Sequence, residues 1–417
     1  MKRLVTIKTK YFMMCLMLWY FCDDAIISGF THLLGGYAHL IWLFGFVCLF
    51  SFSLVFSNKN NLLIPICLYV SIVFLVLFTS VFHPEYADWF HHSYYNLNNM
   101  LVHPRGAIWA FIVVWLIDDP EDIYSTLRIV CWILFIYYLL QYAQAMRIGY
   151  WTIYDIDGTE SQMTYNMEFG YAMMFPAVFF GAVAFLKKVK IYYLFYAVAM
   201  ITILLGGSRG SAVWGILLFP IMLPFKWKNF TKKERHIWLL ACFFLLPLAY
   251  LVYSYLDVIQ LGLSVALSEH GISSRTIEAL FSGELSDANG RDEIYEMAID
   301  LIKTGGPFGR GIYGDRIYIG RFFRWGYSHN VILELLVTFG YVGGSVIVGA
   351  VVYGIYNLFR RVTGITEQII FITFFVTSLK LILSNSFWYV PSFWVVLVLI
   401  IKWKTGTVKQ KKLLGSG

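Results

Sequence analysis

Basic side chains that could hold an anion are concentrated in one long polar stretch, from about Asp257 to Ser328, of an otherwise apolar chain. Arginine is the preferred base there, and its planar guanidinium presents a fork of donors that suits phosphate better than the point charge of lysine. Where the stretch returns to apolar sequence, His329 could act as a base or as a hydrogen-bond donor near neutral pH. These residue types predict a site for a phosphate-bearing ligand, and the alternative is that each arginine pairs with a nearby carboxylate. The arginines of the stretch are Arg275, Arg291, Arg310, Arg316, Arg321 and Arg324.

A further basic position interrupts apolar sequence at residues 206–210, which read Gly-Gly-Ser-Arg-Gly. The glycines are expected to end one helix and Ser208 to cap the next. Arg209 would then lie beside a helix N-terminus, where free N–H groups and the helix dipole favour an anion. The alternative is a plain turn whose arginine reaches the lipid headgroups.

Arg291 begins a segment whose apolar residues recur at helical spacing, and Gly306 and Pro307 provide a stop signal. The pattern predicts an amphipathic helix lying along a membrane surface with Arg291 at its start. The alternative is a surface helix with an N-terminal pair of an arginine and an acid. The apolar positions are Ile294, Met297, Ala298, Leu301 and Ile302.

His329 stands between Tyr327 and Asn330 at the boundary of a following apolar run, a place where a histidine can also be purely structural. Glu334 lies one turn into that run, and Lys380 lies within another. Ionisable groups at membrane depth are functional candidates by default. The alternative for these two is that they pair with each other.

The elements that must position these groups are apolar helices. Of the 417 residues, 59% are hydrophobic and only 14% charged, which indicates a polytopic membrane protein. About twelve apolar windows have roughly the length of a membrane-spanning helix. The predicted class is therefore all-α, with helices 1–9 in residues 1–255, an external helical loop in 256–328, helices 10–12 and a tail in 329–412, and an added tail in 413–417. Gly340, Gly343 and Gly344 mark where the long tenth helix is expected to bend.

The distribution of basic residues orients these helices. With the N-terminus in the cytoplasm, lysine-rich loops alternate with arginine-rich ones, and the lysine-rich side carries most of the positive charge. This is the positive-inside pattern, so both termini are expected in the cytoplasm and the long loop outside.

Carboxylates favour a rival interpretation in which a divalent metal binds phosphate. Asp23 and Asp24 fall in the first external loop, and Asp155 and Asp157 form an Asp-x-Asp string. Such strings are common in loops. The six cysteines all lie in or beside apolar runs, so neither a disulfide framework nor a cysteine-ligated metal is expected.

The basic motifs occur in a recognisable order: Ser-Arg-Gly at 208–210, an outer loop with Arg291 and Pro-Phe-Gly-Arg-Gly at 307–311, and Ser-His-Asn at 328–330 before Gly-Tyr-Val-Gly-Gly at 340–344. This order resembles the O-antigen polymerase and ligase family of bacterial membrane glycosyltransferases. The resemblance covers about half of the chain or less, and the first helices match only in hydropathy.

The resemblance implies a metal-independent enzyme of the bacterial inner membrane, without a cofactor, that uses undecaprenyl-diphosphate-linked glycans as donor and acceptor at the outer face. Arg209 and Arg291 would contact the diphosphate, and His329 would be the catalytic histidine. A chain-length regulator is a possible partner, and nucleic acid is not. Further substrate contacts are expected from Ser208, Arg310, Arg321, Arg324, Tyr327 and Asn330.

Three activities remain open. A polymerase transfers the glycan to another lipid-linked repeat unit, and a ligase transfers it to the core of lipid A. The sequence around Arg209 favours a polymerase, which would act by one-step displacement with inversion. A flippase or transporter for the same lipid is the alternative of a different class, although internal repeats and polar groups near the midplane, typical of transporters, are scarce.

Overall fold

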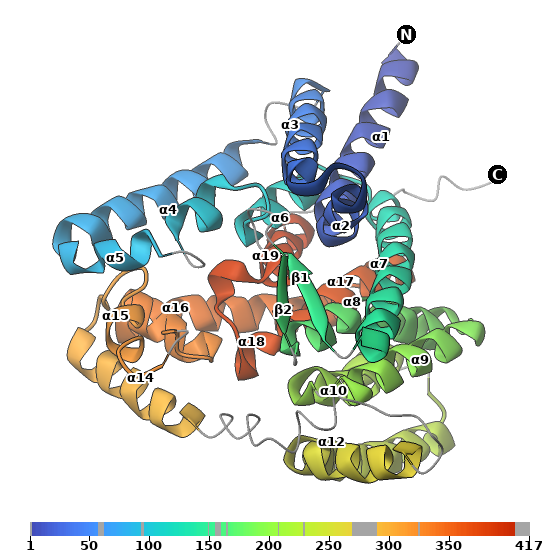
Figure 1. Cartoon of the computed structure of the whole chain (residues 1–417). Coiled ribbons are helices and arrows are strands. Elements are labelled where there is room, and N and C mark those ends of the chain that lie inside the picture. Colours follow the sequence, from blue (N-terminus) through green and yellow to red (C-terminus); the bar gives the residue numbers. More distant parts are fainter. Residues whose placement is uncertain are drawn as a thin grey trace.

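The computed structural model describes residues 2–56, 62–92, 96–148, 150–154, 160–163, 166–206, 208–227, 230–268, 290–323 and 326–404. Apart from one short hairpin, the regular secondary structure of these residues is helical (Figure 1). The all-α class expected from the sequence is therefore confirmed.

The first part of the chain forms a bundle with short connecting helices. Its helices are α1 (Lys2–Phe21), α2 (Asp23–Leu34), η1 (Gly35–Tyr37), α3 (Ala38–Phe56), α4 (Leu63–Phe82), η3 (Pro84–Tyr86), α5 (Ala87–Phe90), η4 (Asn98–Val102), α6 (Ala107–Trp115), α7 (Pro120–Ile148), α8 (Met167–Lys187), α9 (Ile191–Leu205), α10 (Arg209–Ile216) and α11 (Leu218–Lys226).

The remaining helices follow the second half of the chain. They are α12 (Lys232–Ser268), α14 (Arg291–Gly305), α15 (Arg316–Ile319), α16 (Val331–Arg361), α17 (Ile365–Ser378), α18 (Lys380–Leu383), η7 (Phe387–Tyr389) and α19 (Pro391–Lys404).

Among the described residues, 7 helices are long and apolar enough to cross a membrane, or 8 if the bent pair α1–α2 counts as one span. These 7 lie in α3, α4, α7, α8, α12, α16 and α17. Other expected spans are built from shorter helices: α6 has 9 residues, and one window is divided into α10 and α11. A helix of nine residues is about 14 Å long, roughly half of the hydrocarbon thickness. The number twelve therefore remains a prediction.

Contacts between connecting segments fall into two groups, one at each end of the bundle. At one end, Lys402 Nζ lies 3.6 Å from Asp118, Thr366 Oγ1 donates to Glu121 at 2.8 Å, and Lys10 pairs with Asp122. The first half of α1, the start of α7 with the residues just before it, the start of α17 and the end of α19 thus meet. This agrees with the alternation predicted from the basic residues. Which end faces the cytoplasm stays a prediction.

At the other end, Arg105 pairs with both Asp23 and Asp24, at 2.6 and 2.8 Å. The two carboxylates that suggested a metal site therefore share one guanidinium as their partner. Asp155 and Asp157 lie outside the described residues, and the described residues contain no cluster of three or more groups suited to a metal.

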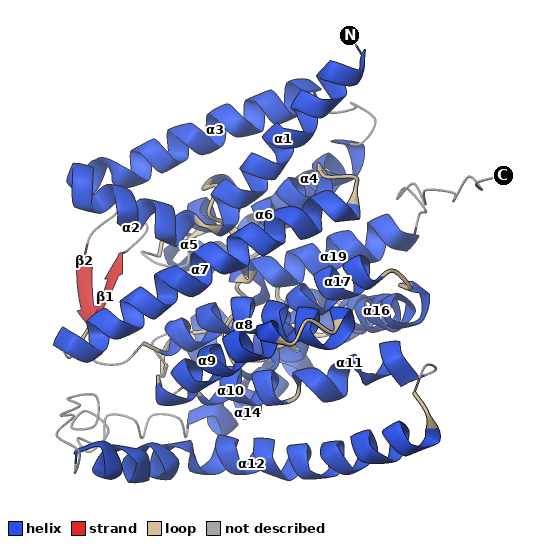
Figure 2. Ribbon diagram, turned by 90° about the vertical axis from the view of Figure 1, so that its right-hand side faces the viewer, coloured by secondary structure: helices blue, strands red, loops and turns tan. Residues whose placement is uncertain are grey.

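Helix α8 forms the centre of the bundle and contacts α7, α9, α10 and α17 (Figure 2). Its sequence contains Phe and Met together with small Ala and Gly residues. The small residues leave room for large side chains of the neighbouring helices. Phe179 and Phe180 are wholly buried, and the Phe180 ring packs against Trp132 and Phe135. Within a membrane such rings stabilise the bundle through van der Waals packing between helices rather than through exclusion of water.

Helix α12 lies along the outside of the bundle (Figure 2). It breaks at Tyr255, whose φ of −124° and ψ of 17° are not helical, and then continues to Ser268. The expected boundary between membrane helices and loop at residue 255 thus falls on a kink, and helix extends into the segment predicted as loop.

Helix α16 bends at Gly340, as the sequence indicated. Gly340 has φ 73° and ψ 173°, a conformation that only glycine adopts without strain. The break frees the carbonyls of Val337 and Thr338, which accept from the backbone N–H groups of Arg310 at 2.8 Å and Gly311 at 3.0 Å. The loop between α14 and α15 is therefore joined to this helix through backbone hydrogen bonds.

The one departure from helix is a short antiparallel hairpin, β1 (Trp151–Tyr154) paired with β2 (Glu160–Met163) (Figure 1). From the sequence, only a polar and aromatic external segment was expected here. Trp151 anchors the hairpin because its ring lies 4.5 Å from that of Phe169 in α8.

Candidate functional site

Arg291 is the first residue of α14, and the helix is amphipathic as predicted. Its buried residues Ile294, Ala298 and Leu301 pack against Val337 of α16 and Ile319 of α15. This packing orients the start of α14, where Arg291 Nη1 donates to the hydroxyl of Tyr253 in α12 at 3.3 Å. Arg291 therefore lies between α12 and the turn that precedes α16.

His329 occupies that turn. Its φ of 51° is in the left-handed region, which a residue with a side chain adopts uncommonly. The imidazole lies against the Tyr327 ring, with 4.1 Å between ring centroids. Its Nδ1 atom is buried and has no hydrogen-bond partner among the described residues.

The electrostatic environment keeps this imidazole neutral. Burial, together with the positive charges of Arg291 and Arg316, lowers the pKa of His329 from its ordinary value to about 3. The charge of Arg291 thus acts on His329, and the catalytic roles of the two residues remain predictions. A neutral imidazole can accept a proton or a hydrogen bond.

Asn330 holds the backbone directly after His329. Its Oδ1 accepts from the backbone N–H groups of Ile332 at 2.9 Å and Leu333 at 3.3 Å, which makes it the N-cap of α16. Its Nδ2 donates to the carbonyl of Ile382 in α18 at 3.2 Å. These contacts are structural, so its expected contact with substrate remains a prediction.

Arg209 is the first residue of α10, and α9 ends at Leu205, as expected for the glycine-rich turn. Ser208 is the N-cap residue, but its hydroxyl makes no capping bond and is buried without a partner among the described residues. The reason is close packing on α8: a Cβ at Gly170 would lie 2.1 Å from Ser208 Cβ. The helix start is thus held by contact with α8 rather than by the serine cap.

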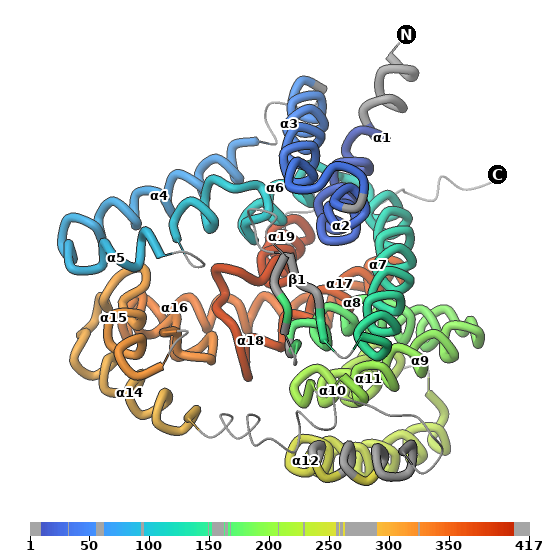
Figure 3. Tube along the Cα trace, in the orientation of Figure 1, coloured from blue at the N-terminus to red at the C-terminus, as the bar shows by residue number. Residues whose placement is uncertain are grey.

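Helix α10, which begins at Arg209, contacts helices that carry the partners of Arg291 and Asn330. It contacts α12, which carries the Tyr253 partner of Arg291, and α18, which receives the bond from Asn330. The course of the chain shows α18 between α16 and α10 (Figure 3). Convergence of all three side chains on one cavity remains a prediction.

Residues 193–348 match a protein-family model described as O-antigen ligase. This part of the chain belongs to the O-antigen ligase family. The match extends from α9 into α16 and so includes Arg209, Arg291 and His329. No curated protein and no solved structure matches the chain.

The other arginines expected to bind substrate in this O-antigen ligase family domain remain predictions, and the structure shows the surroundings of two of them. Arg310 donates to the Tyr318 hydroxyl at 2.9 Å, to Thr304 Oγ1 at 2.7 Å and to the Leu301 carbonyl at 3.3 Å. It therefore ties α14 to α15. Arg321 is exposed and lies over the Tyr318 ring, and Arg324 is outside the described residues.

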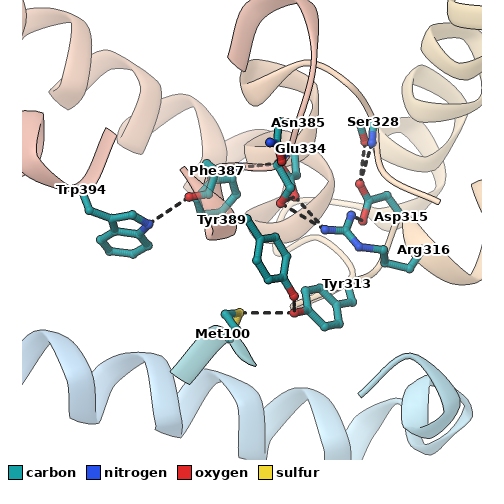
Figure 4. Close-up of polar contacts among 11 residues, drawn as sticks. Met100, Tyr313, Asp315, Arg316, Ser328, Glu334, Asn385, Phe387, Tyr389 and Trp394 are labelled. Atoms are coloured by element: carbon teal, nitrogen blue, oxygen red, sulfur yellow. Dashed lines mark hydrogen bonds and ion pairs between the residues drawn. The ribbon is translucent and has the colours of Figure 1, made fainter. Parts of the chain in front are cut away.

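A buried ionic network in the family domain was not predicted from the sequence (Figure 4). Arg316 is completely buried, and its guanidinium donates to Asp315 at 2.9 Å and to Glu334 at 3.4 Å. Glu334 also accepts from the Phe387 backbone at 3.1 Å. The alternative that Glu334 pairs with Lys380 is wrong, because Glu334 pairs with Arg316 and Lys380 lies 3.8 Å from Glu168. An Asp-Arg doublet followed by a glutamate one turn into an apolar helix is the signal that could have revealed the network.

Proposed function

We propose that this protein is a membrane glycosyltransferase that joins glycan repeat units carried on a lipid diphosphate, a surface polysaccharide polymerase acting at the outer face of the bacterial inner membrane. The observation that carries the proposal is the neutral imidazole of His329 within the field of the Arg291 guanidinium, in a domain of the O-antigen ligase family. A base and a fixed positive charge in one region suit the displacement of a diphosphate by a hydroxyl group.

In the proposed reaction, the oxygen of an acceptor hydroxyl attacks the anomeric carbon of the donor sugar. The bond from that carbon to the phosphate oxygen breaks, and its electron pair leaves with the lipid diphosphate. The hydroxyl proton passes to His329, and displacement in one step inverts the anomeric configuration. General-base assistance of this kind contributes about 10²–10⁴-fold.

Arg209 and Arg291 are proposed to stabilise the charge that develops on the leaving diphosphate. Each preorganised donor in a site shielded from water contributes about 3–4 kcal/mol by analogy with oxyanion holes. Diphosphate is a good leaving group and the guanidinium groups supply the positive charge, so the proposed mechanism is metal-independent.

Substrate binding would also change the pKa of His329. The positive charges of Arg291 and Arg316 help to lower the pKa of His329. A bound diphosphate offsets those charges and so raises the pKa of the imidazole toward its ordinary value. His329 would become an effective base when the donor is present.

The test is incubation of the purified protein with a synthetic lipid-diphosphate repeat unit, followed by separation of the products by length. The expected result is a ladder of glycans from the wild type and none from Arg209→Ala, Arg291→Ala or His329→Ala protein. Normal ladders from all three variants would refute the assignment.

A ligase is the second candidate, favoured by the description of the matching family model. It would use the same donor and residues but transfer the glycan to the core of lipid A. Glycan length in cells lacking the protein separates the two activities. Single-repeat material indicates a polymerase, and long chains that are never delivered indicate a ligase.

A further inference from the structure

We propose that Asp315 and Arg316 are positioning residues for His329, holding the backbone before the histidine and the ring beside it so that the imidazole faces the substrate. This inference rests on the proposed role of His329 as the group that receives the acceptor proton. Neither residue is expected to touch the substrate, because both are buried: Arg316 is 0% and Asp315 1% exposed.

Asp315 fixes the backbone directly before the histidine (Figure 4). Its Oδ2 accepts from both the backbone N–H of Ser328 at 2.9 Å and the Ser328 hydroxyl at 2.8 Å. Its Oδ1 accepts from Arg316 Nη1 at 2.9 Å. One carboxylate thus joins α15 to the residue that precedes His329 by two hydrogen bonds.

Arg316 fixes the ring against which the imidazole lies. Its guanidinium is 5.4 Å from the centre of the Tyr327 ring, and the His329 ring lies 4.1 Å from the same centre. The guanidinium is anchored in turn by Glu334 of α16 and by the hydroxyl of Ser386, at 3.4 and 3.1 Å. The Tyr327 ring therefore links a guanidinium held in the buried core to the imidazole.

Nothing described in the structure orients the imidazole through its own Nδ1 atom. In catalytic triads a third group orients the histidine by accepting from its second ring nitrogen. Here Nδ1 has no partner among the described residues, and the nearby carboxylate of Asp315 bonds to Ser328 and Arg316 instead. The left-handed backbone at His329 also persists only if its surroundings enforce it. The contacts on residues 327, 328 and 330 are therefore what hold the ring.

The experiment compares Asp315→Asn with Asp300→Asn in the purified full chain. Asparagine has the same size as aspartate, but it cannot accept from both Arg316 and Ser328 in the same way. Asp300 is the matched control because it is an exposed carboxylate of the same region, paired with Lys303 at 3.2 Å. Ser328→Ala, which removes only the hydroxyl contact, is the milder second variant.

The first readout is carbethoxylation of His329 by diethyl pyrocarbonate, followed by mass spectrometry across a pH series. The reagent attacks neutral imidazole, so the series gives both the accessibility and the apparent pKa of this histidine without any glycan substrate. We expect faster labelling and an apparent pKa shifted up toward 6.5 in Asp315→Asn, with a smaller shift in Ser328→Ala. Arg291 and Arg316 still face the imidazole in both variants, and loss of the Asp315 charge alone would move the pKa down. An upward shift therefore reports a loosened, more exposed ring.

The second readout is turnover. We expect kcat of Asp315→Asn to fall by about 10- to 100-fold at unchanged KM, because misplacing a reacting group by about 1 Å costs up to about 10²-fold. Labelling and turnover of Asp315→Asn and Ser328→Ala that match Asp300→Asn would overturn the proposal. An inactive wild type would instead refute the proposed function, and the labelling comparison would still decide the positioning role.

Discussion

Replacing Arg291 by alanine is the sharpest test of the proposed site. Among the described residues this guanidinium makes one hydrogen bond, to the Tyr253 hydroxyl at 3.3 Å, and pairs with no carboxylate. Arg310 and Arg316, by contrast, use their donors within the protein. Arg291 is therefore free to bind an anion with most of its donors.

The expected fall in kcat follows from the interaction that each variant removes. Loss of one preorganised cation at a developing negative charge costs about 3–4 kcal/mol, so kcat should fall by roughly 10²–10³-fold. Tyr253→Phe removes only the bond that orients the guanidinium. A typical hydrogen bond contributes about 1 kcal/mol, so that variant should lose about fivefold.

The pH profile gives an independent check. Arg291 is one of the two positive charges that help to lower the pKa of His329, so its removal raises that pKa. Because the base must be neutral, activity in Arg291→Ala should decline at a higher pH than in the wild type as the solution is acidified.

The assay measures chain elongation by purified protein on a synthetic lipid-diphosphate repeat unit, from acidic to neutral pH. Arg360→Ala is the matched control, since Arg360 is an exposed arginine in the last turn of α16 that also donates to a tyrosine hydroxyl, that of Tyr356, at 3.3 Å. Elongation by Arg291→Ala at the level of Arg360→Ala, or an equal loss in both variants, would refute the proposed role of Arg291.

Three further results are expected. His329→Ala should lose about 10²–10⁴-fold in kcat while its thermal unfolding in detergent stays unchanged; a matching loss of folded protein would contradict a catalytic role. Glu334→Ala should lower the free energy of unfolding by about 3 kcal/mol or more, because it leaves the buried guanidinium of Arg316 partly uncompensated; an unfolding curve like that of the wild type would contradict this. Excess EDTA should leave elongation unchanged, whereas inhibition reversed by added magnesium would favour a metal-dependent transferase.

Much of the fold could be predicted from hydropathy, because a helix that crosses a membrane must be apolar along its whole length. The sequence indicated the bend at Gly340, the helix that starts at Arg291 and the glycine-rich end of α9. It did not indicate the extension of α12 beyond Tyr255, since polar residues there are compatible with helix or loop.

Those parts of the candidate site whose chemistry follows from the residue type could be predicted from the sequence. Arg291 and His329 could be singled out because a guanidinium and an imidazole at a membrane boundary are unusual. The partners of each arginine could not be predicted, because they depend on tertiary contacts. Arg310 and Arg316 have the same side chain, six residues apart in the numbering, yet one ties α14 to α15 and the other lies in the core.

The junction between α16 and the preceding loop has a consequence for the order of assembly. The carbonyls of Val337 and Thr338 would be left unpaired if α16 entered the bilayer alone, and such groups cost several kcal/mol in hydrocarbon. The N–H groups of Arg310 and Gly311 that pair with them come from sequence synthesised earlier. The break in α16 is therefore compensated only once this loop packs against it, and the two segments complete each other's backbone only in the finished protein.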